Sequence, residues 1–189
     1  MSSHHIVREK QEPALLVLGL GDFPDELLGQ LLEWSPTVIV TADTVDALVS
    51  RGIKIDWIIT NGSEEIIQSD VKLMSTGTDN LTDAALKYLS ENDYPAVNIV
   101  TDELKLADYE HFANKIDLVI FNGGQKIYPV VNGFSKWKPA GEVISLHGAT
   151  QGLTVQGLEH LVGGGYKTTD DGFICLNFDE PFLFLAEEL

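Results

Sequence analysis

Short apolar runs alternate with amphipathic segments over the first two thirds of the chain. The apolar runs predict strands at 14–20, 37–40, 57–59, 71–74, 96–100 and 116–121. Helical spacing of apolar residues predicts helices from Pro24 to Trp34, and at 44–50, 82–90 and 106–114. Several strands are apolar throughout, as is typical of strands buried on both faces. The alternation predicts an α/β fold with a parallel sheet.

The rhythm changes after Gly124. Glycine-punctuated strands are predicted at 126–131, 141–146, 153–156, 172–178 and 182–185, with no helical pattern between them. In one of them, Phe173 and Cys175 alternate with Ile174 and Leu176, so that one face turns inward. We therefore expect two domains: a Rossmann-like parallel-sheet domain over 1–124 and a smaller all-β sandwich domain over 125–189.

Composition narrows the classes of partner. The 189 residues include 12 basic and 29 acidic residues, a formal charge of −17. Such a charge disfavours nucleic acid, because that binding depends on Lys and Arg neutralising phosphates. No stretch approaches the roughly 20 apolar residues of a membrane span, and the single cysteine, Cys175, fits a reducing compartment. A soluble cytoplasmic protein without nucleic-acid or membrane partners is expected.

The strand-helix-strand unit from Ser35 to Glu65 is expected to hold the site. In an open parallel sheet, ligands bind beyond the carboxyl ends of the strands, here at 41–44 and 60–64. Acids follow predicted strands or open a helix at Asp43, Asp79 and Asp83. Such acids suit Mg²⁺, which takes a few carboxylates together with substrate phosphates. For Asp83, capping of the helix start is an equally good explanation.

The sequence Gly19-Leu20-Gly21 after the first strand raises the alternative of a dinucleotide or nucleotide-sugar enzyme. This signal is weak, because Pro24 occupies the place of the third glycine of the dinucleotide-binding fingerprint. Trp34 and the leucines that precede it are expected to pack in the core rather than to contact a cofactor.

Several segments together resemble the thiamin pyrophosphokinase family, in the form found in Bacteroidetes-type bacteria. They are SSHHIVREKQEPALL, ELLGQLLEWSP, ADTVDALVSRGIKIDW, PAVNIV, WKPAGEVISLHGAT, GLTVQGLEHL and DGF. The resemblance implies a Rossmann-like catalytic domain, a β-sandwich domain and a homodimer. It also implies Mg²⁺-dependent transfer of the pyrophosphoryl group of ATP to the thiamin hydroxyl, with release of AMP.

The resemblance also implies site residues. Those implied for catalysis are Asp43, Asp79 and Asp83; for nucleotide binding Asn80, Thr82, Lys105 and Asp108; and for thiamin binding Thr168 and Thr169. Those implied for the metal are Asp43, Asn61, Ser63, Glu64 and Asp83.

This chain departs from the family pattern at three places. The family has Gly-Asp-Phe-Asp where this chain has Thr60-Asn61-Gly62-Ser63, so both acids are replaced by neutral groups. The Gly-Gly-Arg-x-Asp-His stretch has become 104–109, and the Ser-Ser-Asn loop that helps to bind thiamin is missing around 167–170. Pyrophosphoryl transfer requires positioning and charge stabilisation through metal ions, so these losses favour weak or absent catalysis.

Two hypotheses remain open within the family. In the first, the chain is a working thiamin pyrophosphokinase whose rearranged Mg²⁺ site uses Asp43, Asp79, Asp83 and Glu64. In the second, it is a non-catalytic homologue that binds thiamin or a nucleotide and has a regulatory role.

Overall fold

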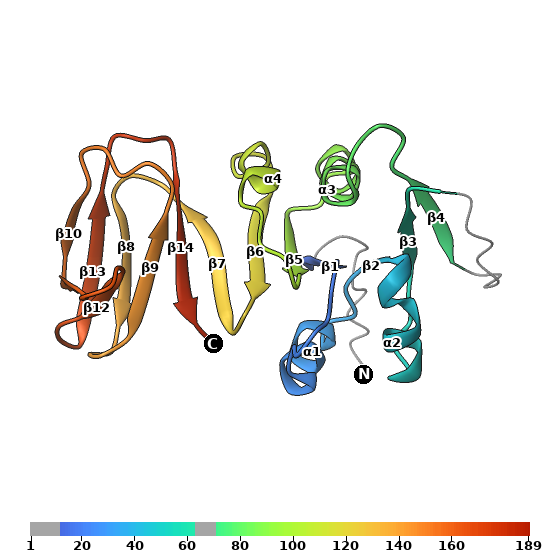
Figure 1. Cartoon of the computed structure of the whole chain (residues 1–189), viewed down its shortest axis with the longest axis horizontal. Helices are drawn as coiled ribbons and strands as arrows, with labels where there is room; N and C mark the ends of the chain where they lie inside the picture. Colours follow the sequence, from blue (N-terminus) through green and yellow to red (C-terminus); the bar gives the residue numbers. More distant parts are fainter. Residues whose placement is uncertain (1–11, 63–70) are drawn as a thin grey trace, which may run out of the picture. The chain divides into compact units, whose positions relative to one another are not determined.

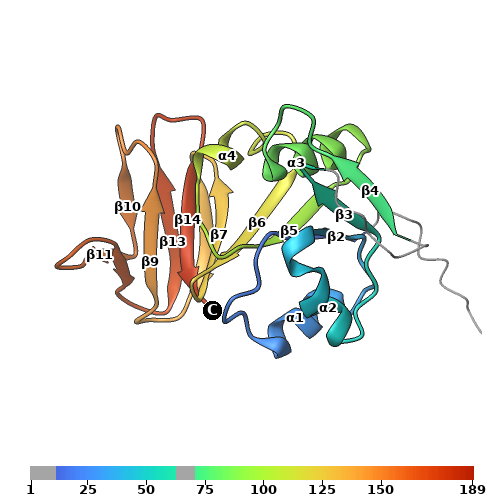
Figure 2. The same ribbon diagram turned by 45° about the vertical axis from the view of Figure 1, so that its right-hand side comes forward.

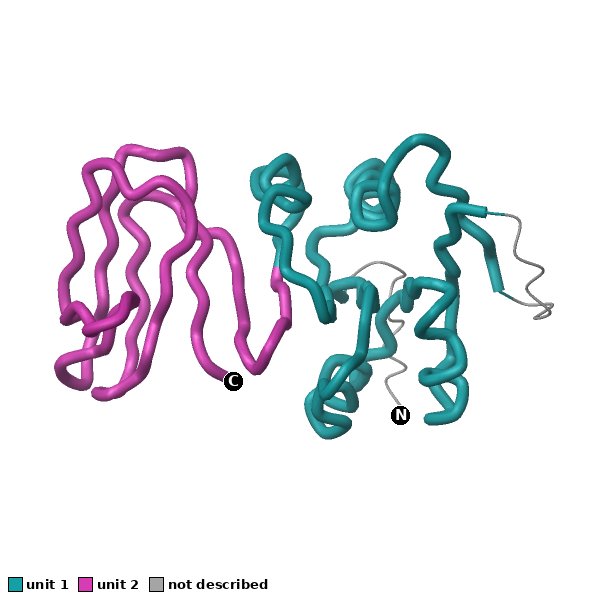
Figure 3. Tube along the Cα trace, in the orientation of Figure 1, with its two compact units in different colours: residues 1–118 teal, residues 119–189 magenta. Residues whose placement is uncertain are grey.

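The computed structural model describes residues 12–62 and 71–189. The chain divides into two compact units, residues 1–118 and residues 119–189 (Figure 3). The boundary predicted after Gly124 lies close by, in the turn between strands β6 (Asp117–Asn122) and β7 (Gln125–Val130). Each unit is described by itself below.

The first unit is built on a parallel sheet. Its strands are β1 (Ala14–Val17), β2 (Val38–Thr41), β3 (Trp57–Thr60), β4 (Lys72–Ser75) and β5 (Ala96–Val100). They lie in the order β5-β1-β2-β3-β4, with every neighbouring pair parallel. All four residues of β1 are buried, because the strand has a sheet neighbour on each side and is covered on both faces.

Helices cover both faces of this sheet. They are α1 (Asp25–Leu32), the short 3₁₀ turn η1 (Ala42–Thr44) with α2 (Val45–Ser50), α3 (Leu81–Glu91) and α4 (Ala107–Glu110). Figures 1 and 2 show α1 and α2 on one face, and α3 and α4 on the other. In the described part of the chain, no helix has both the length and the apolar character needed to cross a membrane.

Two predictions about the helices need correction. Trp34 is 65% exposed, so the prediction that it packs in the core is wrong. Helix α1 ends at Leu32 and the backbone reverses at Ser35, where φ is 54°, which takes Trp34 off the buried side of the helix. The helix predicted at 106–114 is shorter than expected, because α4 ends at Glu110 and the chain continues in turns.

The second unit consists of two antiparallel sheets. One contains β6, β7, β9 (Val143–His147), β11 (Leu158–His160), β12 (Tyr166–Thr168) and β14 (Leu183–Glu188), in the order β11-β12-β9-β14-β7-β6. The other contains β8 (Phe134–Lys138), β10 (Thr154–Gln156) and β13 (Gly172–Asn177). Buried residues of both sheets, among them Ile144, Leu176 and Leu185, form one hydrophobic cluster.

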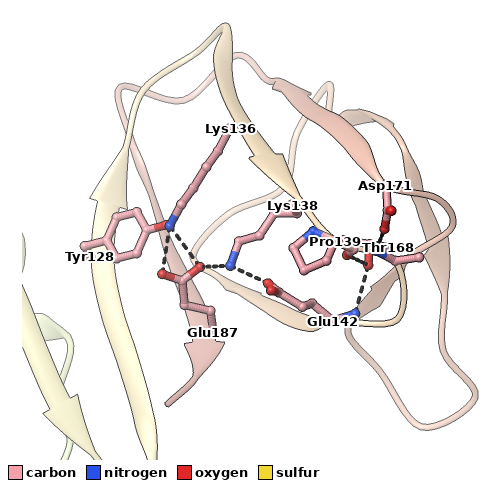
Figure 4. A network of polar contacts seen from close by, with 9 residues as sticks. Tyr128, Lys136, Lys138, Pro139, Glu142, Thr168, Asp171 and Glu187 are labelled. Atoms are coloured by element: carbon pink, nitrogen blue, oxygen red, sulfur yellow. Dashed lines mark hydrogen bonds and ion pairs between the residues drawn. The ribbon is translucent and has the colours of Figure 1, made fainter. Parts of the chain in front are cut away.

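A polar network crosses the interior of this unit (Figure 4). Glu187 on β14 is only 7% exposed and accepts hydrogen bonds from the ammonium groups of Lys136 and Lys138 on β8. The distance from Lys136 Nζ to Glu187 Oε1 is 2.9 Å, and Lys138 also pairs with Glu142. Strand β8 therefore turns Lys136 and Lys138 inward and the half-exposed Trp137 outward, which is the reverse of an ordinary amphipathic strand.

Candidate functional site

Buried threonines end three strands of the parallel sheet. They are Thr41 on β2, Thr60 on β3 and Thr101 after β5. The Thr101 hydroxyl donates to the carbonyl of Glu103 (3.0 Å) and accepts from its N–H (3.3 Å), and Thr60 bonds Gly62 in the same way (both 3.3 Å). These hydrogen bonds join uncharged groups and fix the first residues of the loops after β3 and β5.

A cavity of about 260 Å³ lies at this edge of the sheet. It is lined by Leu18, Thr41, Asn80, Leu81, Thr82, Thr101, Asp102, Glu103, Lys105, Asp108 and Tyr109. The lining includes Leu18 and Thr101, the residues that directly follow β1 and β5. In the sheet, β2, β3 and β4 lie on one side of β1, whereas β5 lies on its other side. The cavity therefore lies at the point where the strand order reverses, which is where open α/β sheets bind ligands.

Tyr109 forms a buried wall of the cavity and is 1% exposed. Burial, and secondly the negative charge of Asp108, raise the pKa of Tyr109 to about 12, although its hydrogen bonds to Thr101 and Thr82 act in the opposite direction. The phenol is therefore neutral at every physiological pH. It ties α4 to the end of β5 and to the start of α3.

The charge of the lining is negative. Asp102, Glu103 and Asp108 contribute three carboxylates, and Lys105 contributes one ammonium group, a balance of −2 among the described lining residues. Lys105 Nζ lies 3.1 Å from Glu103 Oε1, so its charge is already partly neutralised. Such a lining attracts cations and repels anions.

The structure brings together all four residues predicted to bind a nucleotide: Asn80, Thr82, Lys105 and Asp108 line the cavity. Asn80 also caps α3, because its Oδ1 accepts the N–H of Asp83 at 2.7 Å. A side chain that both starts a helix and faces the cavity is held in a fixed position.

The three acids predicted to act in catalysis are not among the lining residues of this cavity. Asp43 is exposed on η1. Asp79 accepts a hydrogen bond from Lys87 Nζ at 2.6 Å, and this bond raises the pKa of Lys87. Asp83 lies in the first turn of α3, where its backbone N–H donates to the side chain of the capping residue Asn80. No finding here tests their catalytic role, which stays a prediction.

The residues predicted to hold Mg²⁺ are only partly described by the structure. Within 12–62 and 71–189, no three His, Cys, Asp or Glu side chains are grouped so that they could share a metal ion. Of the predicted ligands, Asp43, Asn61 and Asp83 are described, whereas Ser63 and Glu64 lie outside the described residues. Because Ser63 and Glu64 are not described, Mg²⁺ binding stays a prediction, and we derive no chemical step through it.

The residues predicted to bind thiamin, Thr168 and Thr169, lie in the second unit. The Thr168 hydroxyl is buried, donates to the carbonyl of Pro139 (2.7 Å) and accepts from the N–H of Glu142 (2.8 Å). Thr169 is exposed, and its N–H donates to the carbonyl of Gly157. Thr168 therefore has a structural role in this unit, and thiamin binding at either residue stays a prediction.

Sequence reasoning missed Thr101, Asp102 and Tyr109. The rule that ligands bind beyond strand ends points to the loop after β5 as well as to the loops after β2 and β3. Thr101-Asp102-Glu103 directly follows the apolar run 96–100, so the same rule would have found it. That β5 lies beside β1 could not be known without the strand order.

No protein-family model matches the sequence, and no curated protein matches it. Solved structures do match. The chain is similar to thiamin pyrophosphokinase from yeast, with a TM-score of 0.69 and 9% identity over 96% of this chain and 88% of that chain. The enzyme from Geobacillus thermodenitrificans matches with a TM-score of 0.67 and 12% identity over 93% of this chain and 97% of that chain. The enzyme from Bacillus subtilis matches with a TM-score of 0.62 and 13% identity over 94% of this chain and 99% of that chain. The chain therefore has the thiamin pyrophosphokinase fold, in a sequence that has diverged far from these enzymes.

Proposed function

We propose that the chain is a thiamin pyrophosphokinase-like protein in which pyrophosphoryl transfer is weak or lost and ligand binding at the cavity of the first unit is kept. In this proposal the first unit corresponds to the Rossmann-like catalytic domain and the second unit to the thiamin-binding sandwich. ATP and thiamin are the ligands that the resemblance suggests.

One observation carries the proposal. The residues implied for nucleotide binding, Asn80, Thr82, Lys105 and Asp108, line one cavity, whereas the acids implied for catalysis do not. This grouping supports a protein that keeps ligand binding and has weak or no turnover.

The physical demands of the reaction support the loss of turnover. Transfer of a pyrophosphoryl group requires cations that stabilise charge on the transferred group, and Mg²⁺ supplies that stabilisation when it is bound. The described lining carries three carboxylates, and its ammonium group, on Lys105, is paired with Glu103. Asn61 replaces an acid of the family pattern, and a neutral amide holds Mg²⁺ more weakly than a carboxylate does.

Purified protein, thiamin, ATP and Mg²⁺ provide the test. We expect formation of AMP and thiamin diphosphate at or near the background rate. Robust turnover would contradict the proposal and favour the working enzyme with a rearranged metal site.

Calorimetry tests the binding half. Titrations of thiamin and of ATP into the wild type are expected to give heat for at least one ligand, and Asn80→Ser is expected to weaken that binding. Serine keeps the helix cap, so this variant removes the amide from the cavity without unfolding α3. The matched control is Asn92→Ser at the other end of α3, away from the cavity lining. Silence for both ligands would remove the binding proposal.

A homodimer belongs to the same proposal, because the family resemblance implies it. Sedimentation at micromolar concentration is expected to give twice the mass of the 20.7 kDa chain. A monomeric mass would contradict the dimer without bearing on the cavity.

A further inference from the structure

Gly19 and Gly21, in the loop after β1, make room for the carboxylate of Asp102. A Cβ atom on Gly19 would lie 2.7 Å from Asp102 Cγ, and one on Gly21 would lie 2.5 Å from Asp102 Oδ1. Real Cβ atoms do not approach other atoms so closely, so a side chain at either position would displace the carboxylate. The glycines of the Gly19-Leu20-Gly21 motif thus have a structural reason that the dinucleotide hypothesis does not supply.

Glycines at this place in an α/β sheet ordinarily let the backbone approach the phosphates of a ligand. Here an anion of the chain itself occupies the space beside them. Asp102 follows Thr101 at the end of β5, next to β1 in the sheet, and lines the cavity. A carboxylate and a phosphate are both anionic acceptors, so they repel each other at contact distance.

We propose that Asp102 determines the ligand specificity of the cavity: its carboxylate holds the position beside Gly19 and Gly21 against phosphate, so that the cavity takes a ligand presenting a neutral or cationic group there. The inference rests on the proposed function, in that it names the class of ligand which the cavity binds. It concerns the part of the cavity that faces the loop after β1.

The surroundings of the loop support this specificity. Asp22 lies in the loop itself, and the neighbouring cavity lining carries the carboxylates of Glu103 and Asp108 besides that of Asp102. The ammonium group of the lining, on Lys105, is paired with Glu103 at 3.1 Å and is therefore already engaged. A phosphate entering here would meet an excess of negative charge.

Binding of inorganic pyrophosphate tests the proposal. Its affinity is measured by calorimetry for the wild type, Asp102→Asn, Asp102→Gly and Asp108→Asn, with sodium sulfate at equal ionic strength as a control for salt. Asp108→Asn removes the same charge from the same cavity but leaves the glycines and Asp102 unchanged. We expect Asp102→Asn to bind pyrophosphate at least about tenfold more tightly than Asp108→Asn does, and Asp102→Gly to bind at least as tightly as Asp102→Asn.

Each other result overturns the inference. Equal gains in Asp102→Asn and Asp108→Asn would mean that only the overall charge matters. No gain in either, or tight pyrophosphate binding by the wild type, would mean that Asp102 does not exclude phosphate. Should Asp102→Asn melt well below the wild type, Asp102→Ser takes its place. Because pyrophosphate is the probe, failure of thiamin and ATP to bind the wild type would defeat the proposed function and leave this comparison intact.

Discussion

The polar network of the second unit and the cavity of the first unit use charge in opposite ways. In the network, Glu187 and Glu142 meet Lys136 and Lys138, with Glu187 and Lys138 buried and Lys136 and Glu142 partly exposed (Figure 4). Around the cavity, three carboxylates face one ammonium group, which is itself paired. Charges in balance can be buried and become part of the structure, whereas an excess of one sign at a concave surface selects ligands.

The largest expected effect tests the structural side of this comparison. Glu187→Gln leaves Lys136 and Lys138 close together without their shared anion, and we expect the free energy of unfolding to fall by about 3 kcal/mol. Urea unfolding followed by circular dichroism measures it. Glu188→Gln, at the exposed neighbouring residue on β14, is the matched control and should change stability by less than about 0.5 kcal/mol. Equal effects would show that the pairing has no special role.

Lowering the pH should weaken the same network. Burial alone would raise the pKa of Glu187, but its bonds with Lys138 and Lys136 outweigh burial and lower it below 4.5. The stabilisation is therefore complete above about pH 4.5 and is lost as the pH falls through the folded-state pKa. Unfolding free energies measured from pH 7 to pH 3 should decline less steeply for Glu187→Gln than for the wild type. Parallel curves would contradict this assignment.

The position of the Asp102 carboxylate beside Gly19 can be tested through the free energy of unfolding, without any ligand. Gly19→Ala places a methyl group against the Asp102 carboxylate, which is exposed and can move, and should cost about 1 kcal/mol or less. In an Asp102→Gly background the cost should shrink, and a double-mutant cycle by urea unfolding measures the coupling. Gly29→Ala, on α1, is the control: apart from its chain neighbours and the backbone of its own helix, the added Cβ meets no atom within 4 Å, and the change should stabilise by about 0.5–1 kcal/mol. Zero coupling would mean that the carboxylate does not occupy the space beside Gly19.

An effect of similar size concerns the cap at the cavity. Asn80→Ala removes the acceptor for the Asp83 N–H and should cost about 1 kcal/mol in thermal or urea unfolding, whereas Asn80→Ser should cost only a few tenths. If the two variants lose stability equally, Asn80 stabilises α3 through something other than its cap.

The parallel sheet could be predicted because its signals are local. The run at 96–100 is a strand at the same residues, and the pattern at 82–90 is the helix α3, with Ala85, Leu86 and Leu89 buried at helical spacing. Each needs only its own sequence to show which side is buried.

Strand β8 could not be predicted because its pattern is inverted. Lys136 and Lys138 turn inward only because Glu187, about fifty residues further along the chain, is there to receive them. Trp34 fails for a related reason: its helical spacing continues past the residue where the helix ends. In both cases the partner or the chain reversal that decides burial lies outside the pattern.

The candidate site was predictable in part. Asn80, Thr82, Lys105 and Asp108 were named from sequence and meet at one cavity. The strand-end rule points to Asp102 but not to its contact with Gly19 and Gly21, because these glycines lie about eighty residues earlier and come near only through the pairing of β1 with β5.

Turnover by wild type and by a variant with restored acids tests the central claim most directly. AMP formation from ATP, thiamin and Mg²⁺ is measured for the wild type and for Asn61→Asp with Ser63→Asp, which returns the two acids of the family pattern. We predict background rates for the wild type and Mg²⁺-dependent nucleotide binding that is stronger in the double variant. Robust AMP formation by the wild type would contradict the account. So would a double variant that exceeds the wild type neither in AMP formation nor in Mg²⁺-dependent nucleotide binding.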